Sequence, residues 1–468
     1  MEEELNFFST ITELALLLRS RKITSVKLTE GYLERLEKYG PRLGAVATVM
    51  AESALEEARA ADKEIQSGHD RGPLHGIPYG AKDLLATRRA KTTWGAKPYE
   101  DQQFDYDATV ITKLHAAGAV LVAKLAMVEL AGGMGYSEAH ASLTGACKTP
   151  WNTNFWSGGS SSGPGSATAA GLVGFSIGSE TSGSIITPAA FSGVSGLRPT
   201  YGAVSRHGAM ALCWTLDKLG PMCRSARDCA VVFRAIAGHD ESDPTSRNRP
   251  VPLKKISTRR PRRLRVGVMK DSYEKAQPEV KENFLRSVDV LKRFSAIEMD
   301  VKLPDFPYGP TVGTIVDAEG AAAFRDLIES GRVQQLASPS GKVGGFSASV
   351  VTAVDYLHAM RMRAPMRHAW SEMFKKIDIL VAPSRATVSY PIDKTFDQAY
   401  PGIGASSPIA ASNLVGVPAI SIPNGFGQNN LPTGIQFIGP AWSEDVLVGL
   451  AEGYQNVTDW HRRQPKLD

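Results

Sequence analysis

The ten residues from Ser157 to Ser166 (SGGSSSGPGS) constrain the fold most, because nine of them are Gly or Ser. A stretch of this composition is typical of a flexible linker when polar sequence surrounds it. Here residues 167–177 (ATAAGLVGFSI) follow directly and are small and apolar, as expected for a buried helix that leads into a strand. A second compact turn follows at residues 178–185 (GSETSGSI). We therefore expect the Gly/Ser stretch to be a turn between core elements.

Helical and strand patterns alternate along the rest of the chain. An apolar run at residues 119–125 (AVLVAKL) follows a helical pattern at 107–117 and is typical of a strand covered on both faces. Further strand patterns lie at 74–83, 264–269, 377–382 and 418–423, and further helical patterns at 278–295 and 443–457. We predict an α/β fold in which helices surround a mixed, mostly parallel twisted sheet.

The chain has 468 residues, which is more than a usual single domain. Residues 1–70 show helical patterns, with Thr10 and Glu13 spaced as a capping box, and we expect them to form an N-terminal helical segment. Residues 71–468 are expected to form the α/β domain that contains the Gly/Ser stretch. The polar, proline-containing residues 240–263 are its predicted connector.

The net charge is +5, and much of the excess lies at residues 254–265 (KKISTRRPRRLR), which hold seven basic side chains. No aromatic side chain lies among them to stack on bases, and a proline interrupts them, so a solvated connector is favoured over a nucleic-acid site. The four cysteines form no CxxC pair, which predicts reduced, buried thiols. The acidic start lacks a secretion signal, and no apolar run approaches the roughly 20 residues of a membrane span. We expect a cytoplasmic protein.

Two other functions of a Gly/Ser-rich turn agree poorly with this sequence. A phosphate-binding P-loop ends in Gly-Lys-Ser/Thr, which the stretch lacks. Residues 159–163 match the G-x-S-x-G nucleophile elbow with Ser161 at its centre, but an elbow follows a strand. The preceding residues 149–156 (TPWNTNFW) contain a proline and two asparagines and make a poor strand.

Three ordered motifs carry a stronger signal. Residues 158–200 contain GGSSSG, then GSETSGSI, and close with GLRPT. Residues 73–83 read PLHGIPYGAKD, and residues 412–423 and 431–439 read SNLVGVPAISIP and LPTGIQFIG. Together they resemble the signature, lysine and closing-strand motifs of the amidase-signature family. The resemblance implies the amidase-signature fold for the catalytic domain at 71–468, and a serine hydrolase that cleaves C–N bonds.

Carried over by position, the resemblance assigns the nucleophile to Ser184 and the base to Lys82. The bridging serine, which follows a cis peptide bond in the family, falls on Ser160, and Ser161 is expected to support the network. The backbone of the turn is expected to form the oxyanion hole, at Thr181, Ser182, Gly183 and Ser184.

A lysine acts as a base when burial lowers its pKa from about 10.4 toward roughly 7–8. Small or apolar residues at 80–81 and 84–85 flank Lys82 and favour this role over an exposed charge. We expect His75, beside the lysine motif, and His461, in a polar tail, to have no catalytic role.

The substrate is less defined by the sequence. By resemblance, Gly132, Gly133 and Met134 are expected near the acyl side of the site, where small residues leave room for a bulky group. Residues 354–370 read as a helix interrupted at Pro365, and their Met and aromatic side chains are more typical of core than of a ligand pocket. If that helix borders the cleft, an apolar or aryl substrate is favoured.

The predicted activity is hydrolysis of small-molecule amides or carbamates (urethanes), with esters as a side activity. One alternative is an A-type subunit of a tRNA-dependent amidotransferase; many family members, including those subunits, carry Arg where this chain has Ile186, which argues mildly against it. Another is a catalytically silent binding protein, which the Lys82, Ser160 and Ser184 set argues against. We expect a monomer or homodimer that needs no cofactor or metal and binds neither nucleic acid nor membrane.

Overall fold

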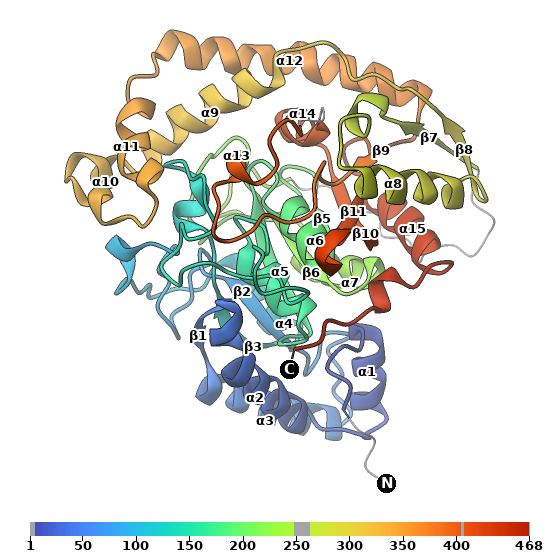
Figure 1. Ribbon diagram of the computed structural model, residues 1–468. Helices are drawn as coiled ribbons and strands as arrows, with labels where there is room; N and C mark the ends of the chain where they lie inside the picture. The colour runs from blue at the N-terminus through green and yellow to red at the C-terminus, as the bar shows by residue number, and fades with distance from the viewer. Residues whose placement is uncertain (1–4, 248–262, 404–406, 468) are drawn as a thin grey trace.

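The computed structural model describes residues 5–247, 263–403 and 407–467. Most of the predicted connector, and all of the basic run except its last three residues, lie outside these ranges. The central feature is one sheet of eleven strands surrounded by helices (Figure 1). The predicted α/β fold with a mixed sheet is thus confirmed, although among the described strands four pairings are parallel and six are antiparallel.

The strands follow one another across the sheet in an order that differs from their order in the chain. From edge to edge they are β1 (Val46–Val49), β3 (Val120–Leu125), β2 (Pro78–Lys82), β4 (Phe175–Glu180), β6 (Lys218–Cys223), β5 (Ser195–Arg198), β10 (Ala419–Phe426), β11 (Pro432–Ile438), β9 (Ile379–Pro383), β7 (Leu264–Val268) and β8 (Ser295–Glu298). Strand β2 pairs in parallel with β3 and β4, and β7 pairs in parallel with β8 and β9. The strands between these two groups pair antiparallel.

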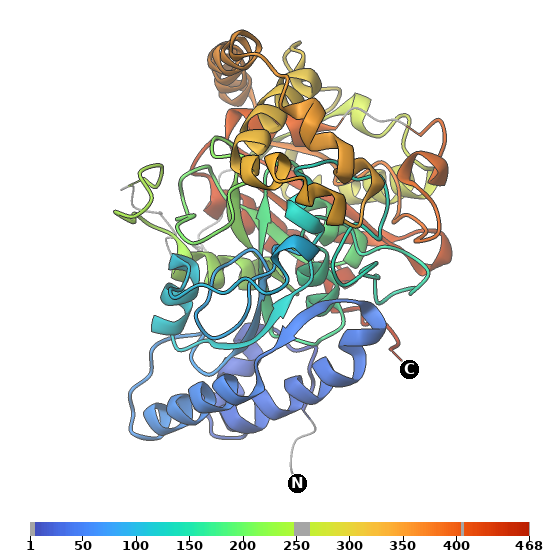
Figure 2. The same cartoon turned by 90° about the vertical axis from the view of Figure 1, so that its left-hand side faces the viewer.

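Helices cover both faces of the sheet (Figures 1 and 2). Their bounds are α1 (Ile11–Arg19), α2 (Ser25–Leu43), α3 (Ala51–Gln66), α4 (Thr109–Ala116), α5 (Ser162–Ala169), α6 (Ile186–Ser192), α7 (Ala226–Ile236), α8 (Pro278–Leu291), α9 (Tyr308–Ala323), α10 (Arg325–Glu329), α11 (Pro339–Ala348), α12 (Ala353–Lys376), α13 (Phe396–Ala399), α14 (Pro408–Val415) and α15 (Glu444–Gln455). Helices α9 and α12 cross the top of the view in Figure 1, and α1 to α3 lie at the bottom.

The N-terminal segment is joined closely to the rest. The predicted capping box of Thr10 and Glu13 is present at the start of α1. The backbone N–H of Ile11 donates to the buried carboxylate of Asp228 at 3.1 Å, and β1 adds an edge strand to the sheet beside β3. The segment is therefore not purely helical, and the boundary at residue 70 stays a prediction.

Helix α12 corrects one expectation. It runs through Pro365 without interruption, and the proline lies on its exposed face. All four cysteines are free and buried, as predicted. Among the described residues, no helix is both long and apolar enough to cross a membrane.

Candidate active site

Lys82 is the last residue of β2 and is completely buried. Its Nζ lies within hydrogen-bond distance of three hydroxyl oxygens, at 2.7 Å from Ser160 Oγ, 2.9 Å from Ser179 Oγ and 3.1 Å from Ser161 Oγ. Burial lowers the pKa of Lys82 to about 7, against the opposing effect of the Asp217 and Glu180 carboxylates. At neutral pH a large share of this amine is therefore neutral, as a general base must be.

Ser160 and Ser161 lie in the middle of the Gly/Ser stretch, just before α5 begins at Ser162. The last five residues of the stretch, 162–166, are helical and do not belong to the expected turn. The Gly159–Ser160 peptide bond is cis, at the position the resemblance indicated. The Ser160 carbonyl accepts the Val128 N–H at 3.1 Å, which fixes this backbone to the loop after β3. Ser161 Oγ donates to the Ser179 carbonyl at 3.0 Å, so its hydroxyl connects α5 to β4.

Residues 181–184 form the turn between β4 and α6. Gly183 has a φ of +94°, a left-handed conformation that glycine adopts without strain. The Ser184 carbonyl accepts the Ser161 N–H at 3.3 Å, which joins the turn directly to the Gly/Ser stretch. Ser182 is the exposed residue of the turn, and Ser184 keeps 9 % of its surface accessible. Within the described chain, the N–H groups of Gly183 and Ser184 donate to no protein acceptor, which leaves them available to a ligand.

Glu180 binds the residues that directly follow this turn, a role that was not predicted from the sequence. Its carboxylate accepts the backbone N–H groups of Ile185 at 2.9 Å and Ile186 at 3.0 Å, directly after Ser184. Arg198 and Asn413 donate to the other oxygen at 2.9 and 2.8 Å. Burial alone would raise the pKa of Glu180, but Arg198 and these donors hold it at about 2, so the carboxylate is ionised.

Asp217 supports the start of the turn and was also missed. Its Oδ1 accepts the Thr181 hydroxyl at 2.6 Å, while Oδ2 accepts the N–H groups of Leu212 and Cys213 at 2.9 and 2.8 Å. Glu180 and Arg198 are part of the sequence motifs GSET and GLRPT, so the motifs contain a signal for this ion pair. Nothing in the sequence linked Asp217 to residue 181, because that contact depends on how β6 pairs with β4.

The other predicted residues lie as follows. Gly132, Gly133 and Met134 follow a turn in which Leu130 and Ala131 have positive φ, and Met134 is buried in the core. His75 faces Glu64 and accepts the Arg71 N–H, and His461 lies in a short helix near the C-terminus. Neither histidine contacts Lys82 or the serines within the described residues.

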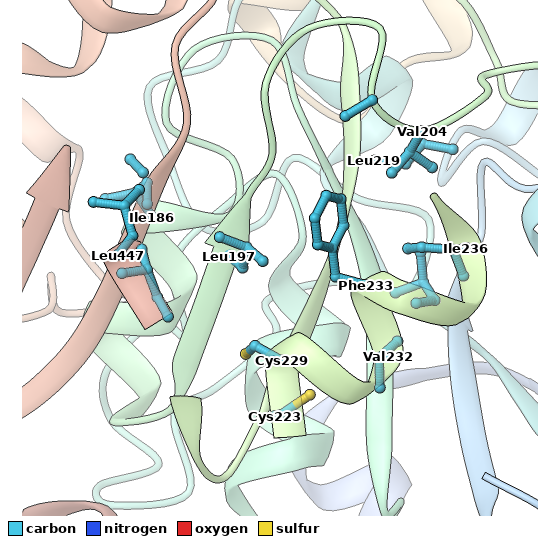
Figure 3. Packing of buried hydrophobic residues seen from close by; sticks show 14 of the residues in the cluster. Ile186, Leu197, Val204, Leu219, Cys223, Cys229, Val232, Phe233, Ile236 and Leu447 are labelled. Atoms are coloured by element: carbon cyan, nitrogen blue, oxygen red, sulfur yellow. The ribbon is translucent and has the colours of Figure 1, made fainter. Parts of the chain in front are cut away.

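Ile186, the first residue of α6, is completely buried. Its side chain belongs to the main hydrophobic core, where it lies near Leu197 and Leu447 (Figure 3). This position is filled by core packing, so it offers no charged group to a ligand.

Comparison with known proteins defines the class to which this site belongs. The sequence profile of the family described as Amidase matches residues 27–448. The A subunit of the glutamyl-tRNA(Gln) amidotransferase of Roseiflexus sp. (strain RS-1) is 37% identical over 484 residues, which cover 98% of both chains. The protein of the same name from Methylococcus capsulatus is 36% identical over 97% of this chain and 98% of that one.

Solved structures agree in fold. The peptide amidase from Stenotrophomonas maltophilia superposes with a TM-score of 0.84 at 29% identity, over 98% of this chain and 99% of that one. The A subunit of the glutamyl-tRNA(Gln) amidotransferase from Thermotoga maritima gives a TM-score of 0.81 at 27% identity, over 99% of both chains. The fold and the similarity define an enzyme that acts on C–N amide bonds. The chain belongs to the amidase family.

Proposed function

We propose that this protein hydrolyses an amide bond through an acyl-enzyme on Ser184, with Ser160 and Lys82 as the proton relay. The observation that carries the proposal is the buried contact of 2.7 Å between Lys82 Nζ and Ser160 Oγ, made by a lysine whose pKa is about 7. A serine hydroxyl is a weak nucleophile until a base accepts its proton, and the base hydrogen-bonded to Ser160 is Lys82.

The reaction proceeds in two halves. Neutral Lys82 accepts the Ser160 proton while Ser160 accepts that of Ser184, and the Ser184 oxygen bonds to the substrate carbonyl carbon. As the C–N bond breaks, Ser160 donates a proton to the leaving nitrogen and recovers one from Lys82. Water then attacks the ester on Ser184 by the same relay, which releases the carboxylic acid and restores the enzyme.

The free N–H groups of Gly183 and Ser184 support an oxyanion hole in this turn. Donors held in place stabilise the negative charge that develops on the carbonyl oxygen, and the loss of one typically costs roughly 3–4 kcal/mol of barrier. Glu180 keeps the turn in position, because it binds the two N–H groups that follow Ser184. Ser161 and Ser179 complete the hydrogen bonds of Lys82.

Two biological settings are consistent with this chemistry. The names of the sequence relatives favour the A-type component of a glutamyl-tRNA(Gln) amidotransferase, which was the alternative at the sequence level, over the free-standing amidase preferred there. In that setting the protein acts with partner proteins, and its substrate amide is glutamine.

The free-standing setting rests on a specific observation. The position that holds Arg in many family members is the apolar, core-packed Ile186. The peptide amidase similarity is consistent with this setting. Its substrates are small amides, with carbamates and esters as related acyl compounds.

A single panel of substrates separates the two settings. The purified protein is assayed alone on glutamine, anilides, aliphatic amides, carbamates and aryl esters, and then with the other amidotransferase components and charged tRNA. Hydrolysis of small amides without partners supports the free-standing enzyme. Glutamine-dependent amidation only with partners supports the amidotransferase setting. Absence of hydrolysis in every arm contradicts the proposed reaction.

A further inference from the structure

A cavity of about 170 Å³ opens beside the proposed reaction centre. Two of its lining residues belong to that centre: Ser179, whose hydroxyl lies 2.9 Å from Lys82 Nζ, and Thr181, which begins the turn of Ser184. Lys82 and Ser184 do not line the cavity themselves, so a group bound there reaches the proposed centre through Ser179 and Thr181. The proposed mechanism does not use this space.

Most of the cavity wall is apolar. Leu84, Met210 and Leu219 line it and are almost completely buried, and Trp214, which is 45% exposed, lies on the same wall. The volume is close to the roughly 150 Å³ of an engineered apolar cavity that binds benzene. A single ring or a branched alkyl group therefore matches the space.

Thr181 and Asp217 in the wall already bind each other, whereas His207 and Ser242, which also line the cavity, are exposed to solvent. Thr181 donates its hydroxyl to Asp217, whose second oxygen accepts the N–H groups of Leu212 and Cys213. A buried carboxylate with these donors has little capacity left for a ligand.

Arg206 is the one arginine in the wall among the described residues, and its guanidinium is also engaged. It donates to Thr245 Oγ1 at 2.6 Å and to the Tyr201 hydroxyl at 3.3 Å, and it stacks on the Tyr201 ring. Its Nε lies 3.7 Å from the Asp243 carboxylate, and Asp243 lines the same cavity. A substrate carboxylate would thus meet two acidic side chains, Asp217 and Asp243, beside an arginine that already has partners.

We propose that this cavity is the subsite for a neutral, compact apolar substituent of the amide substrate, an aryl or branched alkyl group. The inference rests on the proposed reaction at Ser184 in its free-standing setting and adds the class of substrate. Apolar contact supplies the affinity, at roughly 25 cal/mol per Å² of apolar surface removed from water. The apolar wall and the two acidic side chains, Asp217 and Asp243, supply the discrimination against a carboxylate, because an anion would lose its hydration beside like charges.

The inference can be tested by a substitution that narrows the cavity. Ala211 lines it, and Ala211→Leu adds apolar volume without adding charge. The probes are two series of neutral anilides and amides, one with acyl groups from acetyl to benzoyl and one with amines from methylamine to aniline. In one of the two series, Ala211→Leu should lower the ratio of kcat/KM for the bulkiest member to kcat/KM for the smallest at least tenfold below the wild-type ratio. One methylene group in a hydrophobic pocket changes such a ratio by about 10–200-fold.

Two further variants make the result decisive. Ala209→Leu narrows the same wall at a second position, so a folding defect in either variant does not decide the outcome. Ala60→Leu is the matched control, because Ala60 is exposed on α3 and lies outside this cavity. It should leave both series unchanged.

Three results overturn the inference. The first is an unchanged size preference in both series for Ala211→Leu and Ala209→Leu, while a fluorophosphonate still labels Ser184; the proposed reaction would then stand without this subsite. The second is a wild-type kcat/KM for glutamine above that of every neutral amide. The third, no labelling and no hydrolysis by the wild type, removes the proposed reaction itself.

Discussion

Titration of Lys82 should control the pH dependence of the enzyme. The amine is the proposed base only in its neutral form, and burial lowers its pKa to about 7. For a simple titration at that pKa, the neutral fraction is about one-eleventh at about pH 6 and ten-elevenths at about pH 8. We expect kcat/KM to rise about tenfold across this interval and to level off by about pH 9.

The lowered pKa of Lys82 determines how activity and stability change with pH. With an ordinary lysine pKa of about 10.4, the neutral fraction would be below about 1% at about pH 8 and would still rise tenfold per pH unit. The depressed pKa moves the plateau down into the neutral range. The same shift means that the folded protein gains stability from this group as pH rises from about 7 toward the unfolded pKa, and loses it as pH falls.

The assay is the initial rate of anilide hydrolysis at substrate concentrations below KM, because kcat/KM reports the pKa values of the free enzyme. Lys82→Ala should lower kcat/KM by about 10²–10⁴-fold and remove the inflection. Lys218 needs a control, since it is also buried with a pKa of about 7. Lys218→Met should keep the inflection. A wild-type profile that rises with unit slope to about pH 10, or an inflection lost in Lys218→Met and kept in Lys82→Ala, would refute the assignment of the base.

Three other changes probe the turn, the carboxylate that supports it, and a second buried ion pair. Glu180→Gln should lower the free energy of unfolding in urea by about 3–5 kcal/mol, because it leaves Arg198 charged and unpaired in the core; a loss below about 1 kcal/mol would contradict this. Gly183→Ala should slow acylation at least tenfold in a burst assay, because its φ is +94° and the new Cβ would lie 3.3 Å from Thr187. Gly331→Ala, with φ +72° and open space around it, carries a similar backbone cost of about 1–2 kcal/mol and should leave acylation unchanged; equal slowing would exclude a local effect. Asp83→Asn should destabilise the protein by about 3–5 kcal/mol, since Asp83 pairs with the buried Lys124 at 2.9 Å, and an unchanged urea midpoint would contradict it.

The elements next to the site could be predicted because their patterns are local. The apolar run of β3 occupies one contiguous segment, and its length and composition indicate a strand. The Gly/Ser stretch was expected to be a turn throughout, but residues 162–166 begin α5, which composition does not indicate because Gly and Ser are weaker helix formers than Ala. The resemblance of the motifs also predicted that Lys82 and Ser160 belong to one site. In the structure Lys82 Nζ lies 2.7 Å from Ser160 Oγ. Their catalytic roles stay predictions.

What the sequence did not reveal depends on strand pairing. Asp217 reaches Thr181 because β6 runs antiparallel to β4, with Glu180 opposite Lys218. No periodicity in one segment specifies its partner in another, so this contact was not predicted. The continuity of α12 through Pro365 was missed for a related reason: packing of Met366 and Trp370 holds the helix together across the proline.

The most direct test of the central claim is to identify the residue that becomes acylated. The wild-type protein is reacted with a fluorophosphonate or an activated ester, digested and mapped by mass spectrometry, alongside Ser184→Ala and Ser161→Ala. The account predicts one adduct on Ser184 in the wild type and in Ser161→Ala, and none in Ser184→Ala. A stable adduct that persists in Ser184→Ala and disappears in Ser161→Ala would contradict it and would favour the nucleophile elbow.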